Sequence, residues 1–70
     1  MIIKKLIGQL QPGDKVFVHV GGSKFKSACE VKEITFNNVG EGNETATILF
    51  DDGMGKWLQN WYIIEMIEVI

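Results

Sequence analysis

Between Lys15 and Val20 the chain alternates strictly, with a valine at every second position and Lys, Phe or His at the positions between. A period of two is typical of a β-strand that buries one face. The preceding Gln11-Pro12-Gly13-Asp14 has the chemistry of a turn, because Pro fixes φ at the second turn position and Gly accepts the positive φ of the third. Gly21-Gly22-Ser23 fits a hairpin turn, since paired glycines accept its backbone conformation. We therefore predict a strand over Lys15–Val20 between two turns.

A second and longer strand is predicted from about Lys24 to Phe36. Its alternation of apolar and polar residues changes phase near Lys32. Because Val31 and Ile34 cannot share one face of a straight strand, we expect a β-bulge or a sharp bend at this point. Bends of this kind allow small sheets to turn corners, so the phase change favours a small barrel.

Shorter apolar segments separated by turns make up the second half of the chain. The segment Asn37–Glu44 contains two Gly and three Asn and is predicted to be a mobile loop. Asp51-Asp52-Gly53 is predicted to be a second tight turn. The elements expected around these segments are strands over Thr45–Phe50 and Gly55–Leu58 and a single helical turn at Gln59-Asn60-Trp61.

Both ends of the sequence fit more than one kind of element. Apolar residues recur at helical spacing near the N-terminus, so we predict a short amphipathic helix over Met1–Gln9, with a short strand as the alternative. The residues at this spacing are Ile3, Leu6, Ile7 and Leu10. Tyr62–Ile70 is apolar on both faces of a strand or a helix, and we interpret it as a closing strand. A long helix there would replace the barrel with an α+β layer.

The length and the cysteine count predict one domain, residues 1–70, that is held together by packing alone. A chain of this size buries only about 60% of the surface that its unfolded state exposes. One Cys cannot form an internal disulfide, and one Cys with one His cannot form a zinc site. We expect no metal and no cofactor.

Charge is distributed unevenly along the chain, although the net charge is only −2. Residues 1–36 carry six Lys and three acids, a balance of +3, whereas residues 37–70 carry one Lys and six acids, a balance of −5. All seven basic residues are Lys. Because proteins that read bases or clamp phosphates generally use the bidentate geometry of Arg, nucleic acid is the less favoured class of partner.

The sequence has no pattern typical of a targeting or membrane segment. The apolar N-terminal run is split by Lys4 and Lys5, which argues against a signal peptide, and no eighteen consecutive residues are apolar. The lack of paired cysteines fits a reducing compartment. We predict a cytoplasmic protein without a membrane partner. Basic residues that are all Lys, together with nine Ile, suit an AT-rich bacterial or phage genome.

No group of residues has the spacing of a catalytic site. His19 has no nucleophile or paired carboxylate at a recognisable spacing. Cys29 lies among apolar neighbours in a predicted strand, which is typical of an inert buried thiol. Asp51 and Asp52 supply too few oxygens for calcium, and Gly21-Gly22 is not followed by the helix of a phosphate loop. We therefore predict that the protein is not an enzyme.

Two segments resemble the small SH3-like β-barrels, among which the Tudor and KOW-type domains are nearest in pattern. Residues 25–34 are similar to a Tudor second strand, and residues 48–53, with the sequence Ile-Leu-Phe-Asp-Asp-Gly, are similar to its third strand and turn. The resemblance covers roughly residues 12–67. It implies a mainly β fold, a small five-stranded SH3-like barrel.

The same resemblance implies where a ligand would bind. A Tudor-like domain binds its ligand in an aromatic cage between the loop that joins the first two strands and the loop that joins the third and fourth. The residues at matching positions are Phe25, Phe50, Asp52 and Trp57. A KOW-like domain implies contacts with RNA or with a partner in transcription or translation.

Three aromatic residues in the second half could anchor a partner, because aromatic side chains dominate the hot spots of interfaces. They are Trp57, Trp61 and Tyr62. In a domain this small, however, an aromatic side chain is more often part of the core. We expect at least one of the two Trp residues to lie in the core.

These patterns favour a small non-catalytic binding or assembly module whose partner is another protein or a second copy of the chain, bound through Tyr62–Ile70. Apolar side chains on both faces of that segment leave one face exposed in a small sheet. The candidate binding residues are Phe25, Asp52 and Trp57, with Lys24 and Lys26 on either side of Phe25. The alternative is a nucleic-acid-associated barrel that uses a basic face of Lys15, Lys24, Lys26 and Phe25, which Lys32 extends.

Overall fold

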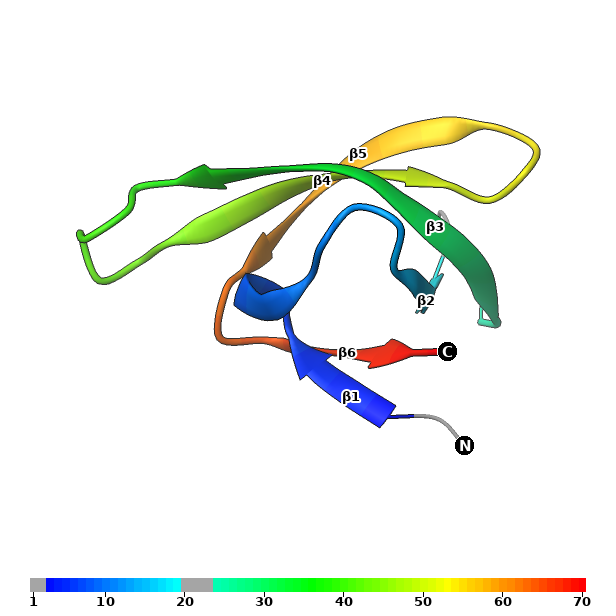
Figure 1. Ribbon diagram of the computed structural model, residues 1–70, viewed down its shortest axis with the longest axis horizontal. Helices are drawn as coiled ribbons and strands as arrows, with labels where there is room; N and C mark the ends of the chain where they lie inside the picture. Colours follow the sequence, from blue (N-terminus) through cyan, green and yellow to red (C-terminus); the bar gives the residue numbers. More distant parts are fainter. Residues whose placement is uncertain (1–2, 20–23) are drawn as a thin grey trace.

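The chain forms one antiparallel sheet of six strands, seen in a computed structural model that describes residues 3–19 and 24–70. The strand order across the sheet is β1-β6-β2-β3-β4-β5 (Figure 1). The elements are β1 (Ile3–Leu6), a short 3₁₀ helix η1 (Ile7–Gln9), β2 (Lys15–His19), β3 (Lys26–Asn37), β4 (Thr45–Asp51), β5 (Lys56–Tyr62) and β6 (Met66–Val69). The mainly β class predicted from the sequence is confirmed.

Strand β3 is the longest strand and joins the two halves of the sheet. Its first half pairs with β2 and its second half with β4. Figure 1 shows β4 and β5 on one side of the molecule and β1 and β6 on the other, with β3 curving from one side to the other. The register shifts between Val31 and Glu33, and the shift lets both Val31 and Ile34 pack inward. The β-bulge predicted near Lys32 is therefore confirmed.

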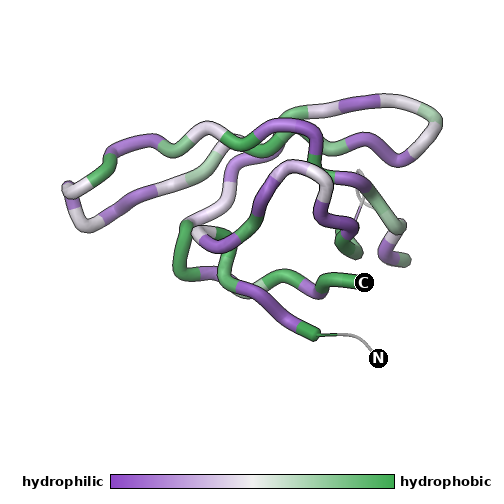
Figure 2. Tube along the Cα trace, viewed as in Figure 1, coloured by the Kyte–Doolittle hydropathy of each residue, from purple (hydrophilic) through white to green (hydrophobic). Residues whose placement is uncertain are grey.

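The two halves of the sheet enclose one core. In β4 every second residue is buried, and Ile48 and Phe50 are completely covered. Figure 2 shows the alternation of hydrophobic and hydrophilic residues along the strands. Burial of each large aliphatic or aromatic side chain stabilises the fold by about 1.5–3 kcal/mol. The buried residues are Ile7, Leu10, Val16, Val18, Cys29, Val31, Ala46, Ile48, Phe50, Ile67 and Val69.

The N-terminal segment is a strand followed by a 3₁₀ turn, so the amphipathic helix predicted over Met1–Gln9 is wrong. Strand β1 pairs with β6, and the Ile7 N–H then donates to a carbonyl of the turn between β5 and β6 at 2.9 Å. A helix of about nine residues is marginal in water, whereas a strand satisfies the backbone groups along the edge of β6. Ile7 and Leu10 reach the core, while Ile3 is 51% exposed and Leu6 37% exposed.

Strand β5 runs without interruption to Tyr62, so the helical turn predicted at Gln59-Asn60-Trp61 is wrong. Every residue of β5 has a partner in β4, and the ladder supplies the backbone hydrogen bonds that a helical turn would form internally. The more buried positions of the strand are Trp57, Gln59 and Trp61. The strand therefore places both tryptophans against the core.

A tight turn leads from β5 into β6, where the Glu65 N–H donates to the Tyr62 carbonyl at 3.0 Å. The closing strand predicted over Tyr62–Ile70 is therefore confirmed as a strand but is shorter, because it begins at Met66. The long helix held as the alternative for this segment is wrong. No helix in the part of the chain that the structure describes is long and apolar enough to cross a membrane.

Strands β1 and β5 are the edges of the sheet, because each has one neighbour in the strand order. The closed five-stranded barrel expected from the resemblance is thus an open, bent sheet of six strands. The additional strand is β1, which the sequence pattern had placed in a helix. The sheet remains open because β1 extends the β6 side of the sheet and does not pair with β5.

The turns that separate the strands follow from glycine and aspartate. In Gln11-Pro12-Gly13-Asp14, the Asp14 N–H donates to the Gln11 carbonyl at 3.1 Å, and Gly13 has a φ of 98°. In the turn between β4 and β5, Gly53 has a φ of 90°. Both turns predicted at these positions are confirmed. The hairpin turn predicted at Gly21-Gly22-Ser23 lies outside the described residues.

Candidate binding site

Strands β2 and β6 separate after two paired positions and so form a fork in the sheet. Phe17 pairs with Glu68, and Val16 pairs with Val69. Beyond these pairs, the remaining described residues of the two strands do not face each other in the ladder. The separation leaves a hollow of about 260 Å³, which we call the fork hollow.

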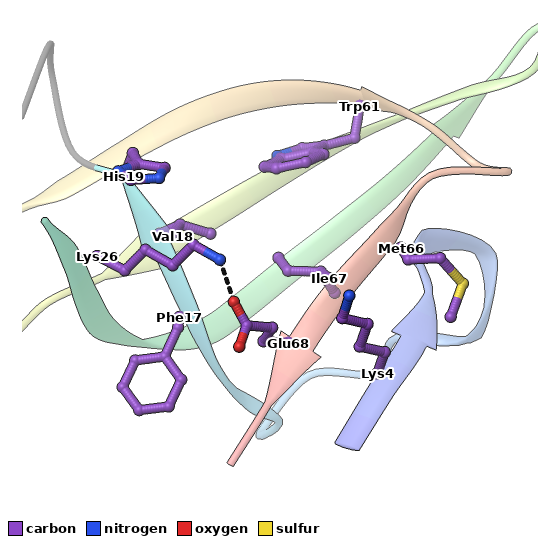
Figure 3. Close-up of a pocket in the computed structure, with 9 residues that line it drawn as sticks. All are labelled: Lys4, Phe17, Val18, His19, Lys26, Trp61, Met66, Ile67 and Glu68. Atoms are coloured by element: carbon purple, nitrogen blue, oxygen red, sulfur yellow. Dashed lines mark hydrogen bonds and ion pairs between the residues drawn. The ribbon is translucent and has the colours of Figure 1, made fainter. Parts of the chain in front are cut away.

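Side chains from five strands line the fork hollow (Figure 3). The apolar part of the lining includes Val18 and Ile67, which are buried, and Trp61, which packs against the core. Lys4 and Glu68 add charge to it. The other lining residues are Phe17, His19, Lys26 and Met66. An apolar wall with a few converging polar groups is typical of a ligand site.

Trp61 contributes a buried donor that has no partner among the described residues. Its Nε1 is covered from solvent and makes no hydrogen bond to any described residue. Figure 3 shows the indole ring extending from β5 over the fork, toward β2. A buried donor left unsatisfied costs about 1–3 kcal/mol. By contrast, Trp57 Nε1 lies 3.4 Å from Gln59 Oε1, to which it donates.

An ion pair between Lys26 of β3 and Glu68 of β6 crosses the fork (Figure 3). The hydrogen bond from Lys26 lowers the pKa of the Glu68 carboxyl, and the nearby charges of Lys4 and His19 lower it further. Desolvation acts in the opposite direction and is outweighed. Glu68 therefore remains ionised at neutral pH and keeps a carboxylate beside the hollow.

The register of the strands shows which side chains share the surface around the fork hollow, because directly opposite residues lie on the same face. Leu6 lies opposite Met66, Lys4 opposite Glu68, and His19 opposite Lys26. Met66 is 52% exposed. We call this surface the outer face, and it consists of Lys4, Leu6, Phe17, His19, Lys26, Met66 and Glu68.

The candidate binding residues named from the sequence do not all gather at one place. Lys26 lines the fork hollow, and Lys24 and Phe25 precede β3 as exposed residues, with Phe25 80% exposed. Trp57 is partly buried, and its ring centroid lies 5.6 Å from that of the core residue Phe50. Asp52 accepts from two backbone N–H groups of its own turn, at 2.8 and 2.9 Å. Trp57 thus packs in the core, and Asp52 shapes a turn.

From the sequence, Trp61 was a candidate aromatic anchor. The sequence did not indicate that its indole N–H would be available to a ligand. The alternation along β5 could have placed its side chain inward, had the strand been recognised there. Its position over the fork depends on how β5 crosses the opposite half of the sheet. That arrangement brings Trp61 together with Lys4 and Glu68, which come from distant parts of the sequence.

The reactive side chain of Cys29 lies in the core and does not line the fork hollow. Cys29 is 3% exposed. Burial raises the pKa of its thiol, and the charges of Asp52 and Asp51 raise it further. Within residues 3–19 and 24–70, no three side chains of His, Cys, Asp or Glu gather in a way that could hold a metal ion. The thiol of Cys29 is therefore kept protonated and covered.

Comparison with known protein families and with curated proteins finds no match for this sequence. Among solved structures, the fold is similar to that of a translation initiation factor eif-5a family protein from Naegleria fowleri, with a TM-score of 0.76 and 20% sequence identity. The likeness covers 97% of this chain and 46% of that one, so this chain spans about half the length of its structural neighbour. At this identity the comparison shows a shared small β fold.

Proposed function

We propose that this domain is a non-catalytic binding module that binds a partner protein through its outer face. The observation that carries the proposal is the fork hollow. There Trp61, whose indole N–H has no acceptor among the described residues, lies beneath a surface of mixed apolar and charged side chains. Aromatic residues and Met are enriched at protein interfaces. Hot spots cluster around pockets that exclude water when the partner binds.

Exposed apolar residues beside the outer face support a protein partner. Around the turn from β5 to β6, Tyr62 is 57% exposed and Ile64 79% exposed, and Ile70 at the end of the chain is 56% exposed. Tyr62 and Ile64 lie close to the outer-face residue Met66 in the sequence, and contiguous exposed apolar surface marks interaction sites. The sequence segment proposed for association, Tyr62–Ile70, contributes these residues, and a second copy of the chain is one form that the partner could take.

A nucleic-acid partner is the second candidate, and the positions of several lysines favour it. Lys4 and Lys26 lie on the outer face, and Lys15 lies on the same side of β2 as Phe17. The structural neighbour belongs to a family of translation initiation factors. The net charge of −2 and the lack of Arg weaken this candidate.

The resemblance to SH3-like domains of the Tudor and KOW type belongs to the same proposal. It is supported by the bent β3 and by the chain of hairpins from β2 to β5. A cytoplasmic location is likewise proposed, on the single unpaired Cys of the sequence.

The experiment that tests the function compares two charge substitutions at exposed apolar residues. Met66→Glu changes the outer face, whereas Leu58→Glu changes a residue of β5 that is 67% exposed and does not line the fork hollow. The immobilised domain is incubated with extract of the source cells treated with nuclease, and the bound proteins are compared between variants. We expect Met66→Glu to lose a specific protein that Leu58→Glu and the unchanged domain retain.

Salt distinguishes the two candidate functions. Binding to phosphates falls steeply as salt rises, because counterions are released on binding, whereas an interface with apolar contacts is much less sensitive. A partner that is lost after nuclease treatment, and whose affinity falls with salt as steeply as phosphate binding does, would support the nucleic-acid candidate and contradict the proposal.

A further inference from the structure

We propose that the fork hollow is an oxyanion site that takes a carboxylate side chain of the partner protein. This inference rests on the proposed function and names the chemistry that the outer face recognises. It concerns one position of the ligand, directly over the Trp61 indole, between β2 and β6.

The Trp61 donor requires an acceptor. Its Nε1–H is buried and makes no hydrogen bond to any described residue, and the ring is held in place by packing against the core. A group that enters the hollow and presents an oxygen would satisfy this donor, and an apolar group would leave it unsatisfied. The hollow therefore selects ligands with an acceptor atom.

The charges around the hollow favour an acidic acceptor. Lys4 and Lys26 line it together with His19, and the acidic residue in the lining is Glu68. The carboxylate of Glu68 already binds Lys26, which shows that the lysine side of the fork hollow can bind a carboxylate. An incoming carboxylate would bind the Trp61 donor and share or replace Glu68 at Lys26, because charge-assisted hydrogen bonds are the stronger ones.

A protein carboxylate fits this position better than a phosphate chain. Leu6 and Met66, directly opposite each other, place apolar surface next to the hollow. Glu68 would repel the closely spaced charges of a nucleic-acid strand. All seven basic residues are Lys, so the bidentate fork that Arg offers to phosphate is missing. A single acidic side chain among apolar neighbours matches the surface.

The test follows the indole N–H resonances by ¹⁵N–¹H NMR while peptides are added. The probe is the capped peptide acetyl-Gly-Leu-Glu-Leu-Gly-amide, and its control carries Gln in place of Glu. Trp61→Phe and Trp57→Phe assign the two indole signals. We expect the Glu peptide to shift the Trp61 signal downfield and to saturate, with the Trp57 signal unmoved and the Gln peptide at least about tenfold weaker, as expected for loss of a charged hydrogen-bond partner.

Four variants separate the donor from the charges. Trp61→Phe keeps an aromatic ring, although a smaller one, and removes the N–H donor, so it should weaken binding of the Glu peptide by about tenfold. Trp57→Phe should leave the affinity for this peptide unchanged. Lys26→Met should weaken binding. Glu68→Gln should strengthen it, because the internal carboxylate no longer competes for Lys26. Backbone NMR spectra confirm that each variant is folded, and Glu68→Gln, which gains affinity, cannot be explained by unfolding.

Several results would overturn the proposal. They are equal shifts of both indole signals, equal binding of the Glu and Gln peptides, or binding of inorganic phosphate or oligouridylate at Trp61 more tightly than the Glu peptide. These outcomes are distinct from failure of the proposed function. If the peptide does not bind but Met66→Glu still loses the captured protein, the outer face is an interface without an oxyanion site. If Met66→Glu captures normally, the proposed function fails.

Discussion

Glu68 and Trp61 both line the fork hollow, but they differ in whether their polar atoms have a hydrogen-bond partner. The carboxylate of Glu68 is held by Lys26, whereas the indole N–H of Trp61 has no acceptor among the described residues. The hollow is therefore lined by an acceptor that is already paired and by a donor that has no partner among the described residues. This imbalance makes the hollow receptive to a second carboxylate.

Because Glu68 becomes protonated in acid, the free energy of unfolding of the domain should depend on pH. Its folded pKa is lowered, chiefly by the Lys26 hydrogen bond and also by the charges of Lys4 and His19. The stabilisation is therefore complete above the ordinary pKa of 4.5 and is lost as the pH falls through the lower, folded value. Chemical denaturation from neutral to acidic pH should show that Glu68→Gln is less stable at neutral pH and that the difference vanishes in acid.

The same measurement in a Lys26→Met background provides the control for Glu68. Without the lysine, the main cause of the lowered pKa is gone. The difference in stability that Glu68→Gln makes in this background should therefore lose most of its pH dependence. A pH dependence that persists unchanged would mean that another group causes it.

Cys29 should react slowly with thiol reagents in the folded protein. Its side chain is covered, and burial together with Asp52 and Asp51 raises the pKa of the thiol, so little thiolate forms at mildly alkaline pH. Alkylation by iodoacetamide, followed by mass spectrometry, should be slow in buffer and fast in guanidinium chloride. Equal rates in the two conditions would show that the β2–β3–β4 region opens readily.

At the scale of elements, the hairpin between β4 and β5 depends on one backbone conformation. Gly53 has a φ of 90°, which a residue with a side chain adopts only with strain. Gly55, in the same turn, shows no such φ, and a side chain there would meet open space. The turn is also supported by Asp51, which accepts from the Gly53 N–H at 2.8 Å.

Gly53→Ala should therefore lower the free energy of unfolding by about 1–2 kcal/mol more than Gly55→Ala does. Because Cβ atoms at both positions have open space around them, the difference isolates backbone strain from steric overlap. Urea denaturation of the two variants measures it. Equal effects would indicate that the turn relaxes to another conformation in Gly53→Ala.

Elements whose pattern reflects local chemistry were predictable from the sequence. The alternation of β2 and the phase change of β3 follow from side-chain packing on a pleated surface. For this reason the sequence predicted both the strand β2 and the bulge in β3. The helix predicted at the N-terminus was wrong, although the apolar residues there have helical spacing. Residues 3–6 pair with the edge of β6, and the spacing of apolar residues carries no information about that distant strand. Lys26 was found as a candidate, but its partner Glu68 lies 42 positions away.

At the scale of the whole molecule, several of the apolar residues left on the surface lie on β1, on β6 and in the turn before β6. Leu6 and Met66 are partners in the ladder between β1 and β6, and Ile64 lies in the turn that precedes β6. The N-terminal segment covers the core with Ile7 and Leu10 but does not cover these side chains. Apolar surface therefore remains where β1, β6 and the preceding turn meet.

We expect this surface to produce association of two or more copies at high micromolar concentration. Sedimentation velocity over a range of concentrations should show a rising sedimentation coefficient. Met66→Lys should reduce the rise, whereas Leu58→Lys, at a residue that does not line the fork hollow, should not. The covered area contributes roughly 25 cal/mol per Å², so a few side chains suffice for weak association. If the chain is monomeric at all concentrations, the prediction of self-association is wrong, and the proposed partner is then a different protein.

Strand β6 lies between β1 and β2 in the sheet, although it follows β5 in the sequence. The hairpins from β2 to β5 connect neighbours in sequence and can form early, but Ile3 must find Val69 across nearly the whole chain. Closing such long loops slows folding. During synthesis on the ribosome, the pairing partners that β6 supplies to β1 and β2 are therefore missing until β6 has emerged, and in this interval unpaired strand edges expose the nascent chain to aggregation.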